Sequence, residues 1–356
     1  MNGSEKFSRI RRQPGAPEQE SPLETQRLAR EERRILRQIS LALLVIFSFL
    51  EVPQKLHASE KIRLTVSNLN MSFLTAGVAL RRGFFKDEGL DAEVIRMRVP
   101  VMITALSTGD IDYTMVFGSV VRAALRGLPV KVVASFLDGS AHALIARPEF
   151  KSVRELGGRT LGIESHGASS DVVARLMIKH FGIDPEKEMK IVALGSDQAR
   201  LAALKEGLVD VAVISPPADA EGKRMGFNVL SRAYELFKFP FVGLGVNAKT
   251  IQERPDQVKR TLKALIKANR YIRQNREGSI QVLMEWARVE PDLAAVTYDS
   301  TWKVFSPDGS IPEDGLRLVV EQAKKELRIT REVSLGDVSA VTLVRDAQRE
   351  LGIQGR

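Results

Sequence analysis

The segment LGIESHGASSD, residues 161–171, brings together side chains that could do chemistry. Ser165 stands next to His166, and Asp171 follows a few positions later. Serine, histidine and aspartate form hydrolytic triads, in which the histidine must lie within hydrogen-bonding reach of the nucleophile. Gly167 also completes half of the G-x-S-x-G pattern around a nucleophilic serine, although the first glycine of that pattern is missing. Because side chains of adjacent residues tend to point apart, we favour the alternative that this segment is a loop that holds a ligand.

A helix is predicted directly after this loop, and its N-terminus favours a small anion. The first turn of a helix has unpaired N–H groups and a partial positive charge. Gly167 lets a ligand approach the backbone, and Ser169 and Ser170 add hydroxyl donors. Ser169 or Ser170 can instead cap the helix, and both roles are compatible because they use different donors. We therefore expect ligand contacts from residues of this loop: His166, Gly167, Ala168, Ser169 and Ser170.

The composition limits the chemistry that this chain can perform. The 356 residues include no cysteine, which excludes disulfides, thiolate metal sites and cysteine nucleophiles. The four histidines have no metal-ligand spacing, and no phosphate-binding P-loop occurs. We therefore expect no metal and no cofactor. The net charge of +9 is spread over a mixed-charge sequence, which is typical of a solvated surface and not of a nucleic-acid-binding face.

The N-terminal region, residues 1–58, has the features of an export signal. Residues 39–50, ISLALLVIFSFL, carry no charge, and three arginines stand just before them. A positive flank, an apolar run and the small residue at position 58 are typical of a secretory signal peptide. The run is shorter than the roughly 20 residues of a comfortable membrane span. We expect an exported mature protein beginning near residue 59, and the alternative is an uncleaved N-terminal anchor.

The remaining sequence contains an internal repeat. Residues 105–116, ALSTGDIDYTMV, align with residues 203–214, ALKEGLVDVAVI, and each aligned pair is 98 positions apart. The same offset aligns β-rich runs on either side of these segments. Asp112 and Asp210 form one aligned pair, for which we expect a structural role in a turn or cap. The repeat, with its alternation of strand and helix patterns, predicts two similar α/β lobes with mostly parallel strands.

Ligand-facing residues follow from this architecture, because ligands of parallel α/β sheets lie at the carboxyl ends of the strands. The first and third strands of each lobe therefore end in candidate binding loops. Besides the loop at 165–170, the candidate residues in these loops are Asn70, Ser72, Gly118, Ser119, Ser215 and Pro216. Asp138 and Arg147 are weaker candidates for the rim.

The order of the elements predicts where the chain passes between lobes. We expect the first lobe in residues 59–147, the second in 148–241, and a return to the first in 242–356. Hinges are expected near 142–147 and 242–246. Thr250 and Glu253 read as a capping box that opens a long helix over 250–272.

Several segments together resemble a known family. Residues 76–97, AGVALRRGFFKDEGLDAEVIRM, match a pattern of a short helix, then G-[FY]-F, then E-G-L-[DN]-V-[ED], with alanine replacing the usual valine. This pattern resembles the periplasmic solute-binding proteins of ABC importers for nitrate, sulfonate, taurine and thiamine precursors, which are similar to the fungal thiamine-pyrimidine synthesis protein. Residues 105–116, 127–136 and 253–264 resemble further elements of that family. The matching positions are Gly83, Phe84, Phe85, Glu88, Gly89, Leu90, Asp91 and Glu93.

The resemblance implies a type II periplasmic binding fold, with two α/β lobes joined by two crossover strands and a ligand cleft between them. It implies a monomeric receptor, not an enzyme, that captures a small solute. The helix N-terminus after residue 168 and the basic balance of the chain favour an anion, of the sulfonate, nitrate or taurine kind. The partners would be an ABC permease and a separate ATPase. Two enzymes on the same scaffold stay open as alternatives: a hydrolase using Ser165 and a synthase of the thiamine pyrimidine. The fungal synthase has a cysteine-rich iron-binding segment, which this cysteine-free chain lacks.

Overall fold

The computed structural model describes Arg34, Arg37 and residues 59–354. The apolar run at 39–50 and nearly all of the predicted signal peptide lie outside the described residues. Ala58–Arg356 makes up one compact unit. Within the described part of the chain, no helix has the length and apolar character needed to cross a membrane.

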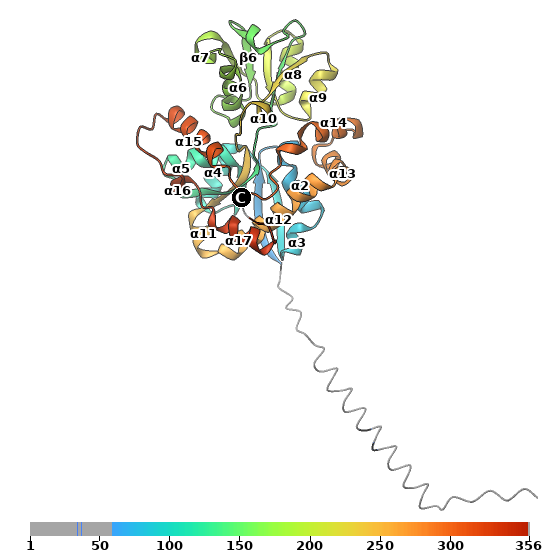
Figure 1. Ribbon diagram of the computed structural model, residues 1–356, viewed down its shortest axis with the longest axis vertical. Coiled ribbons are helices and arrows are strands. Elements are labelled where there is room, and N and C mark those ends of the chain that lie inside the picture. Colours follow the sequence, from blue (N-terminus) through green and yellow to red (C-terminus); the bar gives the residue numbers. More distant parts are fainter. Residues whose placement is uncertain (1–33, 35–36, 38–58, 355–356) are drawn as a thin grey trace, which may run out of the picture. The chain divides into compact units, whose positions relative to one another are not determined.

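The first of two sheets has the strand order β2-β1-β3-β10-β4 (Figure 1). β1 pairs in parallel with β2 and β3, whereas β10 pairs antiparallel with both β3 and β4. The strands are buried on both faces near the centre, as expected of a sheet covered by helices. Their bounds are β1 Glu60–Val66, β2 Leu90–Arg96, β3 Tyr113–Val116, β4 Val130–Leu137 and β10 Val242–Asn247.

The second sheet repeats this arrangement with the order β7-β6-β8-β5-β9. β6 pairs in parallel with β7 and β8, and β5 pairs antiparallel with β8 and β9. Strand for strand, the two orders are equivalent, which confirms the predicted pair of similar α/β lobes. The bounds are β5 Ala143–Ala146, β6 Thr160–Ile163, β7 Lys190–Ala193, β8 Val211–Ile214 and β9 Asn228–Arg232.

The aligned positions of the repeat have matching structural roles. Gly109 and Gly207 both have left-handed backbone conformations, with φ of 87° and 70°, at the ends of equivalent helices. The Asp112 carboxylate accepts the N–H of Arg63 at 2.8 Å, and the Asp210 carboxylate accepts the N–H of Thr160 at 2.9 Å. Each aspartate therefore fixes its third strand to the start of its first, in keeping with the structural role expected of both.

The chain crosses between the lobes through residues 138–142 and 237–241, which lie between strands of different sheets. The predicted boundary after residue 147 is therefore wrong by one strand. β5 was assigned to the first lobe, but it hydrogen-bonds to β8 and β9 of the second. Its apolar sequence suits a buried strand of either sheet, so that composition does not distinguish the two positions.

Helices cover both sheets, and those after β10 pack mainly on the first lobe (Figure 1). The first lobe contains the 3-10 helix η1 Met71–Phe73 and helices α2 Leu74–Arg81, α3 Phe84–Asp87, α4 Val99–Thr108 and α5 Phe117–Leu125. The second contains the 3-10 helix η2 Val153–Leu156 and helices α6 Ser169–His180, α7 Pro185–Glu188, α8 Asp197–Lys205, α9 Ala218–Arg224 and α10 Ala233–Leu236. The remainder are α11 Ala248–Glu253, α12 Pro255–Gln274, α13 Arg276–Ala287, α14 Pro291–Thr301, the 3-10 helix η3 Trp302–Val304, α15 Glu313–Leu327, α16 Leu335–Val338 and α17 Thr342–Glu350.

The predicted helix over 250–272 is two helices, α11 and α12, which meet at Arg254. Asn247 caps α11 by accepting the N–H of Lys249 at 2.9 Å, so Thr250 is not the cap that the sequence suggested. Pro255 occupies the first turn of α12, where a missing N–H is harmless.

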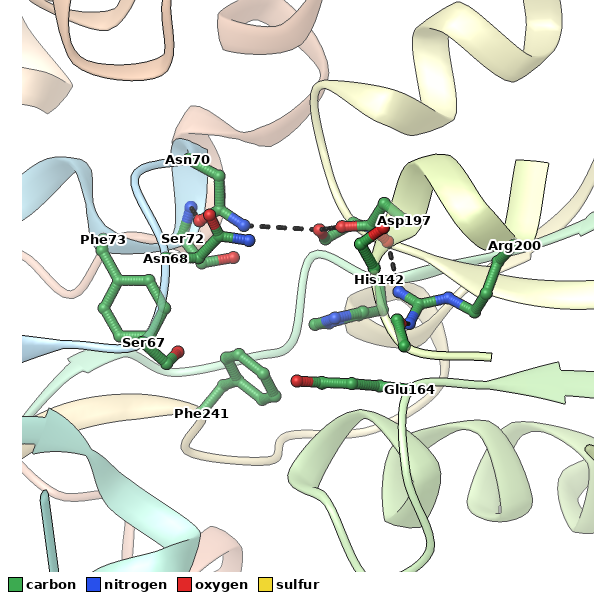
Figure 2. A pocket seen from close by; sticks show the side chains of 13 residues that line it. Ser67, Asn68, Asn70, Ser72, Phe73, His142, Glu164, Asp197, Arg200 and Phe241 are labelled. Atoms are coloured by element: carbon green, nitrogen blue, oxygen red, sulfur yellow. Dashed lines mark hydrogen bonds and ion pairs between the residues drawn. The ribbon is translucent and has the colours of Figure 1, made fainter. Parts of the chain in front are cut away.

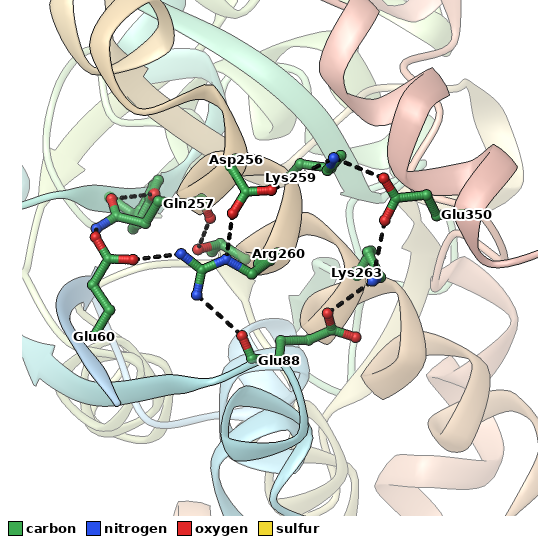
Figure 3. Close-up of polar contacts among 10 residues, drawn as sticks. Glu60, Glu88, Asp256, Gln257, Lys259, Arg260, Lys263 and Glu350 are labelled. Atoms are coloured by element: carbon green, nitrogen blue, oxygen red, sulfur yellow. Dashed lines mark hydrogen bonds and ion pairs between the residues drawn. The ribbon is translucent and has the colours of Figure 1, made fainter. Parts of the chain in front are cut away.

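An ion-pair network fastens α12 to the start of the first sheet and to the last helix, α17 (Figure 3). The nearly buried carboxylate of Glu88 forms ion pairs with the Nζ atoms of Lys263 at 2.9 Å and Lys267 at 2.6 Å. The carboxylate of Glu350 in α17 forms ion pairs with the Nζ atoms of Lys259 at 2.7 Å and Lys263 at 3.2 Å. The C-terminal helix is thereby joined to the core of the first lobe through charges as well as apolar packing.

Candidate ligand-binding site

A cavity of about 80 Å³ lies between the lobes, at the carboxyl ends of strands from both sheets (Figure 2). β1 leads into it from the first lobe, and β6, β7 and β8 lead into it from the second. The linkers between the lobes also reach it through His142 and Phe241. Its lining residues are Ser67, Asn68, Asn70, Ser72, Phe73, His142, Glu164, Gly195, Ser196, Asp197, Arg200, Ser215 and Phe241.

The wall from the first lobe is uncharged and, apart from Phe73, polar. Asn70 caps η1 by accepting the N–H of Ser72 at 3.1 Å, and its amide nitrogen donates to Ser215 Oγ of the second lobe at 3.3 Å. The two lobes therefore touch across the cavity. Ser72 is 2% exposed, and its hydroxyl has no hydrogen-bond partner. A buried hydroxyl without a partner is costly and indicates a site that a ligand or water can complete.

The wall from the second lobe is organised around Asp197. Its carboxylate accepts the backbone N–H of Ser215 at 3.0 Å, the hydroxyl of Ser215, and the guanidinium of Arg200. Arg200 also donates to the carbonyl of Gly195. Arg200 is nearly buried and its charge compensates that of Asp197, although its Nε atom is buried without a hydrogen-bond partner.

Glu164 follows directly after β6 and is the remaining charged residue of the cavity wall. Its Oε2 atom accepts the hydroxyl of Ser170 at 2.9 Å. In Figure 2 its carboxylate points toward Phe241, away from the Asp197–Arg200 pair.

His142 contributes a neutral imidazole to the cavity. Its side chain is buried, its Nδ1 atom lies 2.8 Å from Ser140 Oγ, and its ring packs on Phe241 with centroids 4.8 Å apart. Burial lowers the pKa of His142 to about 4, because the charged form would lose its hydration. Near neutral pH this residue therefore adds no positive charge to the site.

The structure brings three of the predicted residues, Asn70, Ser72 and Ser215, to the cavity wall. Ser170 lies one step behind it, through its hydrogen bond to Glu164. The other predicted residues do not line this cavity: Gly118, Ser119, His166, Gly167, Ala168, Ser169 and Pro216.

Three of those outlying residues, Gly118, Gly167 and Ser169, lie where the lobes meet a second time. A Cβ atom on Gly118 would stand 3.2 Å from Ser169 Oγ, and one on Gly167 would stand 2.9 Å from Glu326 Oε1 of α15. Ser119 Oγ accepts Arg122 at 3.0 Å. The absence of side chains at the two glycines permits this close approach, so their role in the structure is contact between the lobes.

The N-terminus of α6 is organised differently from the predicted anion site. Ala168 occupies the capping position, and neither Ser169 nor Ser170 caps the helix. The N–H of Gly167 donates to Asp171 Oδ2 at 2.9 Å, so a carboxylate of the chain already occupies this place. Asp171 is in turn paired with Arg175 at 2.7 Å.

Ser165 has none of the surroundings of a nucleophile. Its side chain and that of His166 are exposed, and neither residue lines the cavity. Within the described part of the chain, the histidine that does line the cavity, His142, pairs with Ser140. The hydrolytic triad at this segment is therefore not formed.

Sequence reasoning missed Asp197, Arg200 and Glu164. Asp197 begins α8, after the second strand of its lobe, whereas the expected binding loops followed the first and third strands. A signal was available, because Ser196 and Asp197 are N-terminal helix residues that face the carboxyl edge of the sheet. Glu164 stood one position before the predicted loop.

The two tryptophans pack against other residues of the protein. Trp286 lies against Gly77 and donates its indole N–H to the carbonyl of Asn70 at 3.1 Å. Arg273 lies over the ring of Trp302, 5.4 Å from its centroid.

Curated relatives include proteins named as candidate binding proteins. One from Brucella abortus (strain 2308) is 24% identical over 219 residues, which cover 60% of this chain and 67% of the relative. Another, YtlA of Bacillus subtilis (strain 168), is 25% identical over 250 residues, 66% of this chain and 74% of the relative.

Solved structures share the fold at low identity. The periplasmic aliphatic sulphonate binding protein SsuA from Escherichia coli has a TM-score of 0.66 and 18% identity, covering 78% of this chain and 91% of its own. The periplasmic nitrate-binding protein NrtA from Synechocystis PCC 6803 has a TM-score of 0.67 and 15% identity, covering 83% and 89%. The desulfurization enzyme DSZB has a TM-score of 0.59 and 14% identity, covering 82% and 99%. These similarities confirm the two-lobed periplasmic binding fold.

The family assignment rests on a match over most of both lobes. The family model described as NMT1/THI5 like matches residues 70–279, from the first cavity loop to the start of α13. That span includes both linkers and every cavity-lining residue except Ser67 and Asn68. Since the match covers more than half of the chain, the protein belongs to the NMT1/THI5-like family.

Proposed function

We propose that this chain is a solute-binding protein that encloses a small polar solute between its lobes and delivers it to an ABC permease. The observation that carries the proposal is the polar cavity between two equivalent lobes, at the carboxyl ends of their strands. Two linkers between the lobes suit a hinge that opens for entry and closes on the solute. The family and the fold of the sulfonate- and nitrate-binding neighbours support the same function.

The proposal includes export and its partners. Residues 1–58 would act as a signal peptide or as an uncleaved anchor, leaving the described lobes in the periplasm. The protein would act as a monomer, and a separate ATPase would drive the permease.

The size and polarity of the cavity limit the solute. About 80 Å³ gives room for on the order of five water-sized groups. The hydroxyl of Ser72 supplies a donor for a sulfonate, nitrate or taurine-like solute, and Phe73 and Phe241 supply apolar walls (Figure 2). The predicted anion site at the N-terminus of α6 does not add to this argument, because Asp171 occupies it.

An enzyme on this scaffold is the second candidate, because DSZB shares the fold and is named as an enzyme. Ser165, the nucleophile of the hydrolase that the sequence left open, is exposed, which argues against that particular enzyme. A solute that is consumed by the protein would favour the enzyme over the receptor.

A solute panel distinguishes the two functions. We expect one solute among sulfonates, nitrate, bicarbonate, aromatic acids and aminopyrimidines to raise the melting temperature and to be recovered unchanged. At 100 times its Kd such a solute stabilises the folded state by about 2.7 kcal/mol. The chain has two tryptophans, so a Trp302→Phe variant leaves Trp286 as a fluorescent reporter hydrogen-bonded to Asn70. Turnover that is lost in Ser165→Ala would contradict the receptor.

A further inference from the structure

The charged residues of the cavity wall do not balance. Glu164 and Asp197 are acidic, and Arg200 is the basic residue among the lining side chains. Arg200 donates to Asp197 and to the carbonyl of Gly195 through its two terminal nitrogens, so its charge compensates that of Asp197, while its Nε atom has no partner. The uncompensated charge of the cavity wall is therefore that of Glu164.

Nothing in the described part of the chain neutralises Glu164. Ser170 donates to Oε2 at 2.9 Å, whereas Oε1 has no hydrogen bond and no basic side chain lies in salt-bridge contact with either oxygen. His142, on the same cavity, is kept neutral by its burial. Glu164 is exposed although the lobes already touch through Asn70 and Ser215, so water can solvate its carboxylate. A solute that displaces this water without donating to Glu164 leaves a charge without a partner, which is costly. A solute that donates to Glu164 would remove this penalty.

The wall from the first lobe needs a hydrogen-bond acceptor from the solute, whereas Glu164 needs a donor. The buried hydroxyl of Ser72 has no partner, and a hydroxyl hydrogen needs an acceptor. Asn70 is already committed to Ser72 N–H and to Ser215. The cavity therefore has an acceptor on its second-lobe wall and an unsatisfied donor on its first-lobe wall.

We propose that Glu164 determines specificity by selecting a small solute with a cationic or N–H-bearing nitrogen, whose acceptor group meets Ser72. The inference rests on the proposed function, since it names the class of solute for the same cavity. A bare anion such as nitrate satisfies Ser72 but places a like charge near Glu164, which is unfavourable. A solute that has both groups satisfies both walls.

A matched pair of probes tests this inference: methanesulfonate and aminomethanesulfonate, which differ by one amino group. We expect aminomethanesulfonate to bind the mature protein about tenfold or more tightly than methanesulfonate in isothermal titration, because it gains a charge-assisted hydrogen bond. Glu164→Gln, which preserves shape, should reduce the preference to about threefold or less. Glu206→Gln is the control, because Glu206 is an exposed carboxylate of the same lobe outside the cavity.

Three results would overturn the inference. They are equal or tighter binding of methanesulfonate or nitrate, no binding of aminomethanesulfonate at millimolar concentration, and an unchanged preference in Glu164→Gln. Tighter binding of methanesulfonate or nitrate, or an unchanged preference in Glu164→Gln, would leave the proposed function intact. If aminomethanesulfonate does not bind, the proposed function still holds when another solute of the panel binds. The proposed function itself is wrong if no solute of the wider panel binds or if the bound solute is consumed.

Discussion

Replacing Ser72 by alanine should leave the empty protein as stable as before or make it more stable. The Ser72 side chain is 2% exposed, and its hydroxyl lacks a partner. A buried polar group without a hydrogen bond carries a desolvation penalty of about 1–3 kcal/mol. Ser72→Ala removes that group without opening a sizeable cavity, so we expect the free energy of unfolding to rise by about 1 kcal/mol.

Urea unfolding at neutral pH measures this change, and a thermal melt should rise by about 2 °C. Ser279→Ala is the matched control, because Ser279 is equally buried but donates to the carbonyl of Asn275 at 2.6 Å. We expect the control to lose about 1 kcal/mol of stability, since its hydrogen bond disappears. The two variants should therefore move in opposite directions although the chemical change is the same.

The same substitution should weaken solute binding, by about two- to tenfold for one lost neutral hydrogen bond. A gain in stability with a loss of affinity is the signature of a residue kept for a ligand. If Ser72→Ala destabilises the empty protein by more than about 1 kcal/mol, the hydroxyl has a structural partner such as an ordered water, and the reasoning is refuted.

Three further predictions concern stability. Burial lowers the pKa of His142 to about 4, so the unfolded chain takes up a proton near pH 6.5, before the folded chain does. Between pH 7 and pH 4 the free energy of unfolding should therefore fall by about 3 kcal/mol more in wild type than in His142→Gln. Urea unfolding at both pH values measures this difference. Glu88→Gln should lower the free energy of unfolding by about 2 kcal/mol, because it leaves two lysines without their buried partner. Glu350→Gln, at a half-exposed carboxylate, should lower it by less than about 1 kcal/mol, and by less still at high salt. Equal losses in urea unfolding would contradict the burial argument. Gly167→Ala should cost about 1 kcal/mol in a thermal melt, because φ is 75° and the new Cβ meets Glu326, and an unchanged melting temperature would show that the loop relaxes.

The architecture was predictable because the repeat carries it. Positions 98 apart in the sequence occupy equivalent places in the two sheets, as Asp112 and Asp210 show by holding equivalent strands. The family pattern at residues 76–97 predicted the same fold. β5 was misplaced because a crossing strand is an apolar run whose sheet depends on tertiary pairing.

The site was predictable in part. Strand ends of the repeat located Asn70, Ser72 and Ser215, since the carboxyl edge of a parallel sheet is fixed by the order of elements. The charge balance was not predictable, because the i,i+3 spacing of Asp197 and Arg200 on α8 permits an ion pair but does not show that Arg200 pairs there and not with Glu164. The sequence shows that Glu164 is acidic, but only packing shows that it is left without a basic partner.

Blocking the cavity tests the central claim most directly. Ser67 lines the cavity and Ser165 is exposed outside it, so Ser67→Phe fills the cavity whereas Ser165→Phe leaves it open. With the panel solute that binds wild type best, isothermal titration should give one solute per chain, recovered unchanged. We predict that Ser67→Phe abolishes this binding and that Ser165→Phe retains it. Unchanged binding in a folded Ser67→Phe protein would contradict a solute site between the lobes.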